Sequence, residues 1–525
     1  MKNNKKVALI LVIVMSITLI LMGCNGTEEN TSDIKIQDDK KDESSVSINY
    51  SDKNYDTVLV KDYNNLKLDK LNKYNIDVKF NPQDKSYKGK QMVKYVNNEN
   101  VDLNEVYFHL YPNAFKRKET APSLFGGISS AYPDGFKEGY MDIKDIKVNN
   151  TDVDYSISGK GNTILKVPLD ESLKPGEIVE INLEYFVKLP PARDRFGYGD
   201  KTFNFGNWYP IAAVYDDEGW NLDPYYSIGD PFYSDTSNYD ISIETPKNIT
   251  IASSGNILSE EIKDNKKIWK IESRLMRDFA WVASEHFKVL ERDVDGTLVK
   301  VYVLDDNTNE INKLVLDISS DSIDIFNDTF GKYPFGQYSV VQTSFPSGME
   351  YPGIVFIGDK YYNKSRKGYL EIVIAHETGH QWWYSVVGND EIDEAWLDES
   401  ITSYSEVVYC DEKYGKEASE KYFKNNVESG YTRVKEILSD DRVLKPLNEY
   451  KNWTDYGALA YNKGAIFIHE IGKKYGEDTL YNILKKYFKK YSFLIATTED
   501  FKRVCEEVTG EDLTEMFNKW IYNKN

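Results

Sequence analysis

The chain has 525 residues, a hydrophobic fraction of 41% and a formal net charge of −20. A single hydrophobic core rarely grows to serve so long a chain, so the length predicts two or more packed domains. The acidic excess argues against nucleic acid as a partner, because a phosphate-binding surface needs clustered Lys and Arg, and no such cluster follows the first residues.

The first residues have the pattern of an export signal. Three lysines within the first six residues precede an apolar stretch from Val7 to Leu21, which is the length of a signal-peptide core and short for a spanning helix. The following Leu-Met-Gly-Cys sequence, which ends at Cys24, resembles a bacterial lipobox. We therefore expect a lipoprotein signal peptide over residues 1–23, lipidation of Cys24 and an extracytoplasmic protein anchored to the bacterial cell membrane. An uncleaved membrane anchor is the alternative.

Residues 24–65 are predicted to form a disordered tether. The stretch is rich in Asp, Glu, Lys, Ser and Asn and has no aromatic residue before Tyr50, a composition that cannot bury a core. Only Cys410 and Cys505 follow Cys24, so the chain is not a disulfide scaffold and both thiols are expected to be free.

Residues 66–295 have the alternation of strands. Apolar side chains recur at every second position from Tyr74 to Phe80 and again from Tyr239 to Ile243. Turn signals such as Asn81-Pro82 separate such runs. The pattern predicts a mainly antiparallel β domain.

Residues 296–525 are predicted to be mainly helical. The apolar positions from Ile311 to Ile318 share one helical face, and Gly331 supplies a stop. Further helices are expected at 369–383, 394–409, 463–475 and 498–508. The segment 338–357 is instead β-branched and aromatic and is interrupted by Pro346 and Gly348, which predicts strands around a tight bend. The fold class is therefore α+β and multidomain, with a small sheet beside a helical bundle in the second half.

The sequence His376-Glu377-Thr378-Gly379-His380 is a candidate metal site. Two histidines four residues apart lie on one face of a helix, so both imidazoles reach the same ion. A catalytic zinc takes three protein ligands and keeps a fourth position open. Glu399, nineteen residues after His380, is the predicted third ligand. His109, His286 and His469 lack ligand-like spacing and are interpreted as structural.

The motifs HETGHQWW and WLDES, with Gly348-Met349-Glu350-Tyr351 upstream of them, resemble the gluzincin aminopeptidase family of zinc metallopeptidases, which includes aminopeptidase N (membrane alanyl aminopeptidase) and leukotriene hydrolase. Tyr351 stands where the family usually has Asn. Tyr461 in Tyr-Asn-Lys-Gly-Ala matches the tyrosine that the family carries before Lys-Gly-Ala.

The resemblance implies a saddle-shaped β domain followed by a thermolysin-like catalytic domain, without the large C-terminal helical domain of aminopeptidase N. It also implies one zinc ion per chain, Glu377 activating a zinc-bound water, and Tyr461 donating to the oxyanion. Glu350, carried by Gly348 and Met349, would bind the free α-amine of the substrate. The function so implied is an aminopeptidase that removes N-terminal residues from peptides.

Two other functions remain open at this point. A zinc endopeptidase of thermolysin type would use the same metal chemistry with a cleft open at both ends; Glu350 argues against it. A non-catalytic, lipid-anchored binding protein on the peptidase fold is disfavoured because the ligands and Glu377 are intact.

Overall fold

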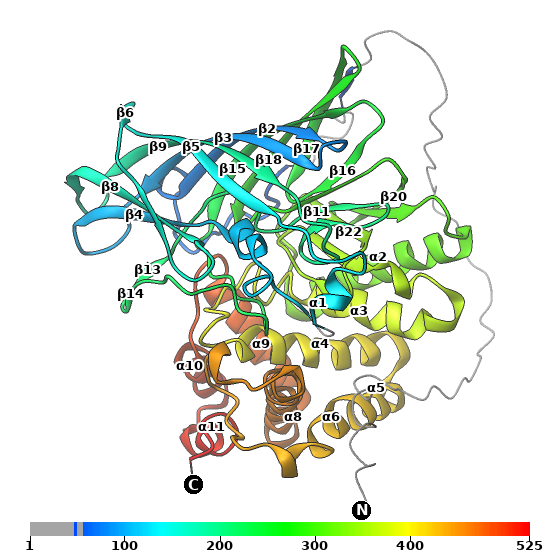
Figure 1. Cartoon of the computed structure of the whole chain (residues 1–525). Coiled ribbons are helices and arrows are strands. Elements are labelled where there is room, and N and C mark those ends of the chain that lie inside the picture. The colour runs from blue at the N-terminus through cyan, green and yellow to red at the C-terminus, as the bar shows by residue number, and fades with distance from the viewer. Residues whose placement is uncertain (1–46, 50–55, 125–126, 525) are drawn as a thin grey trace, which may run out of the picture.

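The computed structural model describes residues 47–49, 56–124 and 127–524. Strands fill the upper part of the molecule in Figure 1, and helices fill the lower part. The predicted signal peptide, Cys24 and most of the predicted tether lie outside the described residues. None of the helices in the described part is both long and apolar enough to cross a bilayer.

The largest sheet belongs to the first half of the chain, and its strand order is β1–β17–β18–β15–β2–β3–β9–β5–β6. The strands are β1 (Ser47–Asn49), β17 (Asn256–Lys263), β18 (Lys266–Met276), β15 (Ser237–Pro246), β2 (Asn72–Asn81), β3 (Ser86–Val96), β9 (Ile178–Lys188), β5 (Tyr140–Val148) and β6 (Thr151–Asp152). Neighbours are antiparallel except β15 and β2, which pair in parallel. In β2, the side chains of Tyr74, Ile76, Val78 and Phe80 are buried, as the alternation predicts.

Shorter sheets complete this half. One has the order β10 (Phe196–Tyr198), β11 (Phe203–Phe205), β19 (Trp281–Ser284) and β16 (Thr250–Ser253); another has β12 (Ile211–Ala212), β4 (Leu103–His109), β8 (Ile164–Leu173) and β7 (Ser156–Ser158). The hairpin of β13 (Tyr215–Asp216) and β14 (Gly219–Trp220) stands apart from them. Aromatic side chains fill the space between these strands; the rings of Phe205 and Trp281 stack with their centroids 3.6 Å apart.

A mixed sheet begins the second half, with the order β20 (Phe287–Val294), β21 (Thr297–Leu304), β22 (Gln337–Thr343), β24 (Ile354–Gly358) and β23 (Gly348–Met349). The predicted domain border at 295 falls in the β20–β21 hairpin. Strands β22, β23 and β24 surround a tight bend, as the segment 338–357 predicts.

The helices of the second half pack below this sheet (Figure 1). They include α2 (Asn309–Phe330), α3 (Lys367–Gly379), α4 (Trp396–Tyr414), α5 (Lys416–Tyr422), α8 (Gly464–Tyr475), α9 (Glu477–Tyr491), α10 (Thr498–Thr509) and α11 (Thr514–Trp520). Thr308 caps the start of α2 by accepting a hydrogen bond from the Ile311 N–H, and Gly331 follows its last residue. Thr497 and Asp500 form a capping box at α10. Cys410 and Cys505 are buried and free, as expected.

Candidate zinc site

Helix α3 places both histidines of the His-Glu-x-x-His sequence at one point. The Nε2 atoms of His376 and His380 are 3.2 Å apart. Both side chains are buried, and the helix ends directly before His380. Gly379 permits α4 to come close, since a Cβ there would lie 3.2 Å from Thr402 Cγ2.

Helix α4 brings Glu399 to the same point. Its Oε2 lies 3.5 Å from His376 Nε2 and 3.3 Å from His380 Nε2. Ligand atoms bonded to one tetrahedral zinc at about 2.0–2.1 Å lie roughly 3.3 Å from one another. Glu399 Oε2 is buried and accepts no hydrogen bond of good geometry from a described residue. Two imidazole nitrogens and a carboxylate oxygen therefore fit the donor set and the spacing of a catalytic zinc.

A second group of side chains orients these ligands. His376 Nδ1 donates to Glu406 Oε1 at 2.7 Å, and the Tyr422 hydroxyl donates to the other oxygen of Glu406 at 2.5 Å. His380 Nδ1 donates to the Trp383 carbonyl at 3.1 Å. Because the proton of each imidazole is held at Nδ1, the lone pair of each Nε2 faces the ligand cluster.

Glu377 lies beside the ligands and against strand β23. A Cβ at Gly348 would overlap Glu377 Oε1, so only glycine leaves room for this carboxylate. Burial raises the pKa of Glu377 to about 7, although the charges of His376 and His380 oppose the shift. Such a carboxyl group is suited to take and return a proton near neutral pH.

Glu350 sits in the bend that follows β23 and is 4% exposed. Its Oε1 is 4.0 Å from His380 Nε2 and accepts no hydrogen bond from the described residues. Gln381 fixes the bend: its Oε1 accepts from the Gly353 N–H at 2.8 Å, and its Nε2 donates to the Glu350 carbonyl at 3.4 Å. Met349 receives the Nε–H of Arg195 on its sulfur at 3.0 Å.

Tyr351, which departs from the family pattern, ties the bend to the β-rich half. Its hydroxyl donates to Asn207 Oδ1 at 2.6 Å, and a Cβ at the neighbouring Gly206 would overlap that hydroxyl. The side chain of Tyr351 therefore anchors the bend to the β-rich half.

Tyr461 belongs to the π-helical turn η8 (Gly457–Lys463) that precedes α8. Its ring stacks on His376 with an interplanar angle of 6° and a centroid distance of 5.7 Å. Its hydroxyl donates to Glu399 Oε1. The tyrosine thus lies at the cluster, within reach of the oxygen of Glu399 that does not face the histidines.

The structure brings together all of the predicted metal ligands and the predicted protein groups around them. His109 instead stacks on Tyr111, and His469 stacks on Phe423. His286 lies beside Asp305. The sequence reasoning did not identify Glu406, although its position seven residues after Glu399, two turns along the same helix, was a usable signal.

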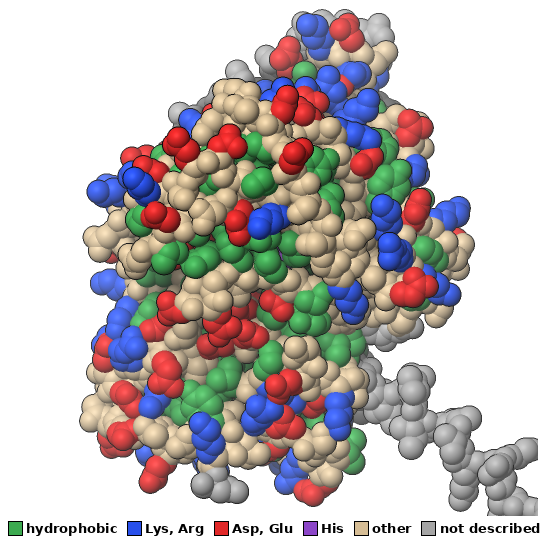
Figure 2. Space-filling model, turned by 60° about the vertical axis from the view of Figure 1, so that its left-hand side comes forward, with side chains coloured by type: hydrophobic (Ala, Val, Ile, Leu, Met, Phe, Trp, Pro, Cys, Tyr) green, Lys and Arg blue, Asp and Glu red, His purple; other side chains and the backbone are tan. Residues whose placement is uncertain are grey.

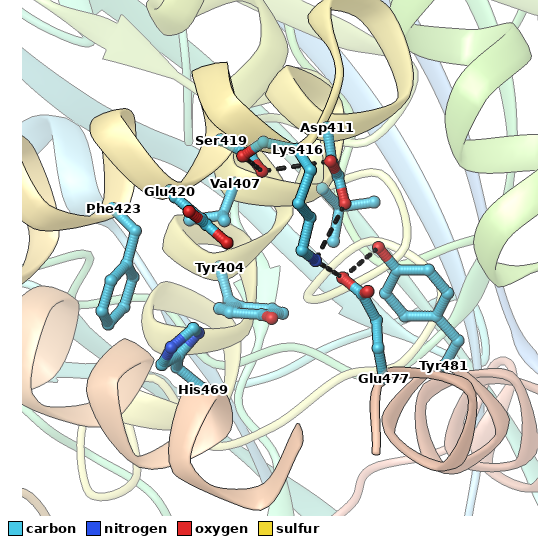
Figure 3. A pocket seen from close by; sticks show the side chains of 11 residues that line it. Tyr404, Val407, Asp411, Lys416, Ser419, Glu420, Phe423, His469, Glu477 and Tyr481 are labelled. Atoms are coloured by element: carbon cyan, nitrogen blue, oxygen red, sulfur yellow. Dashed lines mark hydrogen bonds and ion pairs between the residues drawn. The ribbon is translucent and has the colours of Figure 1, made fainter. Parts of the chain in front are cut away.

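A hollow of about 210 Å³ lies away from this cluster, between α4, α5, α8 and α9. Figure 3 shows Lys416 bridging Asp411 and Glu477 on one side of it and His469 beside Phe423 on the other. It contains none of the predicted metal ligands or catalytic residues, so the candidate active site is the cluster at His376.

Two histidines on one helix, a glutamate on the next helix and a sheet-rich domain earlier in the chain are features of a zinc metallopeptidase. Residues 314–520 match the peptidase family M1 domain. The chain therefore carries a peptidase family M1 domain, which confirms the resemblance to the gluzincin aminopeptidases, and its cofactor is zinc.

The curated relatives are distant in sequence and longer than this chain. Aminopeptidase M1-B of Oryza sativa subsp. japonica is 25% identical over 298 residues, covering 54% of this chain and 34% of the relative. Aminopeptidase N of Streptomyces lividans is 23% identical over 305 residues, covering 54% of this chain and 35% of the relative. The matched part of this chain thus spans about a third of the length of these curated relatives.

Solved structures match the fold over a larger share of this chain. The M1 zinc metallopeptidase from Deinococcus radiodurans superposes with a TM-score of 0.63 at 15% identity, covering 86% of this chain and 93% of that chain. A two-domain M1 zinc metallopeptidase bound to L-arginine gives a TM-score of 0.62 at 15% identity. The likeness establishes a two-domain fold, sheet-rich and then helical.

Proposed function

We propose that the protein is a zinc-dependent aminopeptidase that removes the first residue from peptides. The observation that carries the proposal is the convergence of His376, His380 and Glu399 at mutual distances that suit one zinc ion, with Glu377 and Glu350 on its flanks.

Each residue has a chemical role in this proposal. Zinc, when bound, would polarise the scissile carbonyl and acidify a water molecule. Glu377 takes the proton of the attacking water and returns it to the leaving amine. The Tyr461 hydroxyl, which donates to Glu399 in this structure, would turn to donate a hydrogen bond to the oxyanion.

Glu350 is the residue that favours an aminopeptidase over an endopeptidase in this proposal. A buried carboxylate without a hydrogen-bond donor needs a cation, and the α-ammonium group of a peptide supplies both the charge and the donors. An amine held by Glu350 would bring the first peptide bond of the substrate toward the residues that would hold the zinc ion. The unpartnered Glu350 Oε1 therefore favours removal of single N-terminal residues.

The test compares a free peptide with its N-acetylated form. We expect the wild-type protein to cleave the free peptide from its N-terminus and to leave the acetylated peptide nearly intact. Glu350→Ala should lower kcat/KM for the free peptide by about a hundredfold or more, the scale of a lost buried charge pair. Internal cleavage of the acetylated peptide at the rate of the free one would establish an endopeptidase instead.

We also propose that the protein is an extracytoplasmic lipoprotein anchored to the bacterial cell membrane, on the basis of the lipobox-like sequence that ends at Cys24. Labelled fatty acid should be incorporated into the wild-type protein and not into Cys24→Ala. Equal labelling of both proteins would rule out lipidation at this cysteine.

A further inference from the structure

Arg195 is a buried cation of the first half of the chain that contacts the strand leading to Glu350. It is 2% exposed and directly precedes β10. Its Nε–H donates to the sulfur of Met349 in β23 at 3.0 Å, and its guanidinium carbon lies 5.9 Å from the centroid of the Phe345 ring. Arg195 therefore contacts the chain both before β23 and within it.

The other side of the same guanidinium holds a loop of the first half. Nη2 of Arg195 donates to the Gly229 carbonyl at 3.1 Å and pairs with Asp230. A Cβ at Gly229 would lie 3.1 Å from Cζ of Tyr456, so this loop packs against the catalytic half. The ring centroids of Tyr456 and Tyr461 are 5.5 Å apart. Arg195 thus joins elements on both flanks of the candidate zinc site.

The carboxylate of Glu350 depends on its neighbours in the chain for its position. Its Oε1 accepts no hydrogen bond from a described residue. Met349, which precedes it, is tied to the first half by Arg195. Tyr351, which follows it, is tied there by Asn207. These two contacts therefore set where the carboxylate can meet an α-ammonium group.

A buried charge at position 195 is costly. Removing a guanidinium from water is unfavourable even when it is paired, and Nη1 of Arg195 is buried without an acceptor among the residues that the structure describes. The sulfur of Met349 is only a weak acceptor. An apolar side chain would pack against Met349 and Phe345 at a lower cost. Features that break such local rules concentrate at functional sites, which indicates a role for Arg195 beyond packing.

An amine anchor must provide register as well as attraction. Figure 2 shows acidic side chains gathered on one face, between the strand-rich part and the helical part, and such a surface attracts positively charged peptide N-termini. Attraction alone does not select one peptide bond for cleavage. That selection needs a carboxylate held at a fixed place, and Glu350 Oε1 lies 4.0 Å from His380 Nε2. Small displacements of such a group are costly to the rate.

We propose that Arg195 is a positioning residue that acts through Met349 to hold Glu350 where the α-ammonium group of a peptide binds. This inference rests on the proposed aminopeptidase function. Asp230 neutralises the guanidinium and fixes its orientation. In this role Arg195 contacts neither the substrate nor the metal.

The test compares leucine hydroxamate with its deamino analogue, which differs only in lacking the α-amine. The hydroxamate group of both compounds binds zinc, so the ratio of their dissociation constants, measured by calorimetry on the zinc-loaded protein, reports the contact between the amine and Glu350. Wild type should favour the amine-bearing compound, and Glu350→Ala should remove most of that preference.

Arg195→Met should lower the ratio about tenfold, the scale of losing a group that orients a site residue, while the deamino analogue binds as it does to wild type. Lys267→Met is the matched control. It removes a cation from another largely buried pair of the first half, in which Lys267 Nζ lies 3.3 Å from Glu260 Oε2, and it should leave the ratio unchanged. Equal weakening of both compounds in Arg195→Met would mean that the residue only supports the fold.

Arg195→Lys tests the same role in a variant that keeps a cation for Asp230. The compact ammonium lacks the planar fork that contacts Asp230 and Met349 together. The ratio should therefore fall here as well, although the free energy of unfolding stays closer to that of wild type than in Arg195→Met. A wild-type ratio in the folded Arg195→Lys protein would overturn this inference alone. A wild-type protein that binds both compounds equally would instead contradict the aminopeptidase proposal on which it rests.

Discussion

Glu377 carries the largest share of the proposed chemistry. It is the neighbour of a metal ligand in sequence, yet it is not part of the ligand cluster, because its carboxylate points toward Gly348 rather than between the imidazoles. Metal binding and proton transfer therefore belong to different side chains and can be separated by substitution.

Glu377→Gln should retain zinc and lose turnover by at least about a hundredfold, since the amide is nearly isosteric and accepts no proton. Zinc content by mass spectrometry and the hydrolysis rate of an alanyl reporter check this. A variant that turns over at near wild-type rate would assign proton transfer to another group.

Tyr461→Phe separates two roles of the hydroxyl that contacts Glu399. If it stabilises the oxyanion, kcat should fall by about a hundredfold with zinc affinity unchanged. A zinc affinity that falls while the kcat of the fully loaded protein stays normal would mean that the hydroxyl only supports Glu399.

Helix α3 and strand β23 approach each other so closely that one of them must present a glycine. Gly348 fills that position against the Glu377 carboxylate. The bend after the strand is in turn fixed by Gln381, which follows the last histidine ligand. Helix and bend therefore form one rigid frame for Glu377 and Glu350.

Gly348→Ala should displace Glu377 and lower kcat at least about tenfold with zinc retained, because displacement of a catalytic group by about 1 Å is costly. Gly457→Ala is the control, since a Cβ there meets no atom within 4 Å. Equal activity of the two variants would show that the close approach of β23 is unimportant.

Polar contacts between the two halves of the molecule converge on the site. Tyr351 of the bend donates to Asn207, whose Nδ2 donates to Asp278 at 2.9 Å. Arg277, next in the chain to Asp278, reaches the Tyr384 carbonyl. The sheet-rich half thereby supports the bend and also Tyr384 of the catalytic half, whose φ of 108° is unusual for a residue with a Cβ.

Tyr351→Phe should lower the free energy of unfolding by about 1–3 kcal/mol, because it leaves a buried Asn207 oxygen without its donor. Tyr362→Phe should change stability little, since the Tyr362 hydroxyl is buried without a hydrogen-bond partner among the described residues. Urea unfolding of the two variants measures the difference. Equal losses would show that the Tyr351 contact adds no net stability.

The sequence alone predicted those helices and strands whose pattern is local in the chain. The two histidines share a helix, and the period-two pattern of β2 and the helical patterns of α3, α4, α8 and α10 reflect burial of one face. Helix α9 was not among the predicted helices, although Leu480, Ile483 and Leu484 have helical spacing. The parallel pairing of β15 with β2 joins segments far apart in the chain, and alternation alone does not specify the partner of a strand.

Much of the surrounding site depends on such long-range contacts. Asp230 lies in a loop of the first half and pairs with Arg195, which also donates to the sulfur of Met349 in β23. Neither residue has a motif that marks it in a single sequence.

The central claim is that zinc held by His376, His380 and Glu399 is needed for peptide hydrolysis. The most direct measurement is hydrolysis of an alanyl reporter by the purified protein as isolated, after chelation, and after zinc is returned. We predict about one zinc ion per chain as isolated, loss of hydrolysis on chelation and recovery with zinc, and His380→Ala that neither holds zinc tightly nor recovers. Full activity of the metal-free protein would contradict the account.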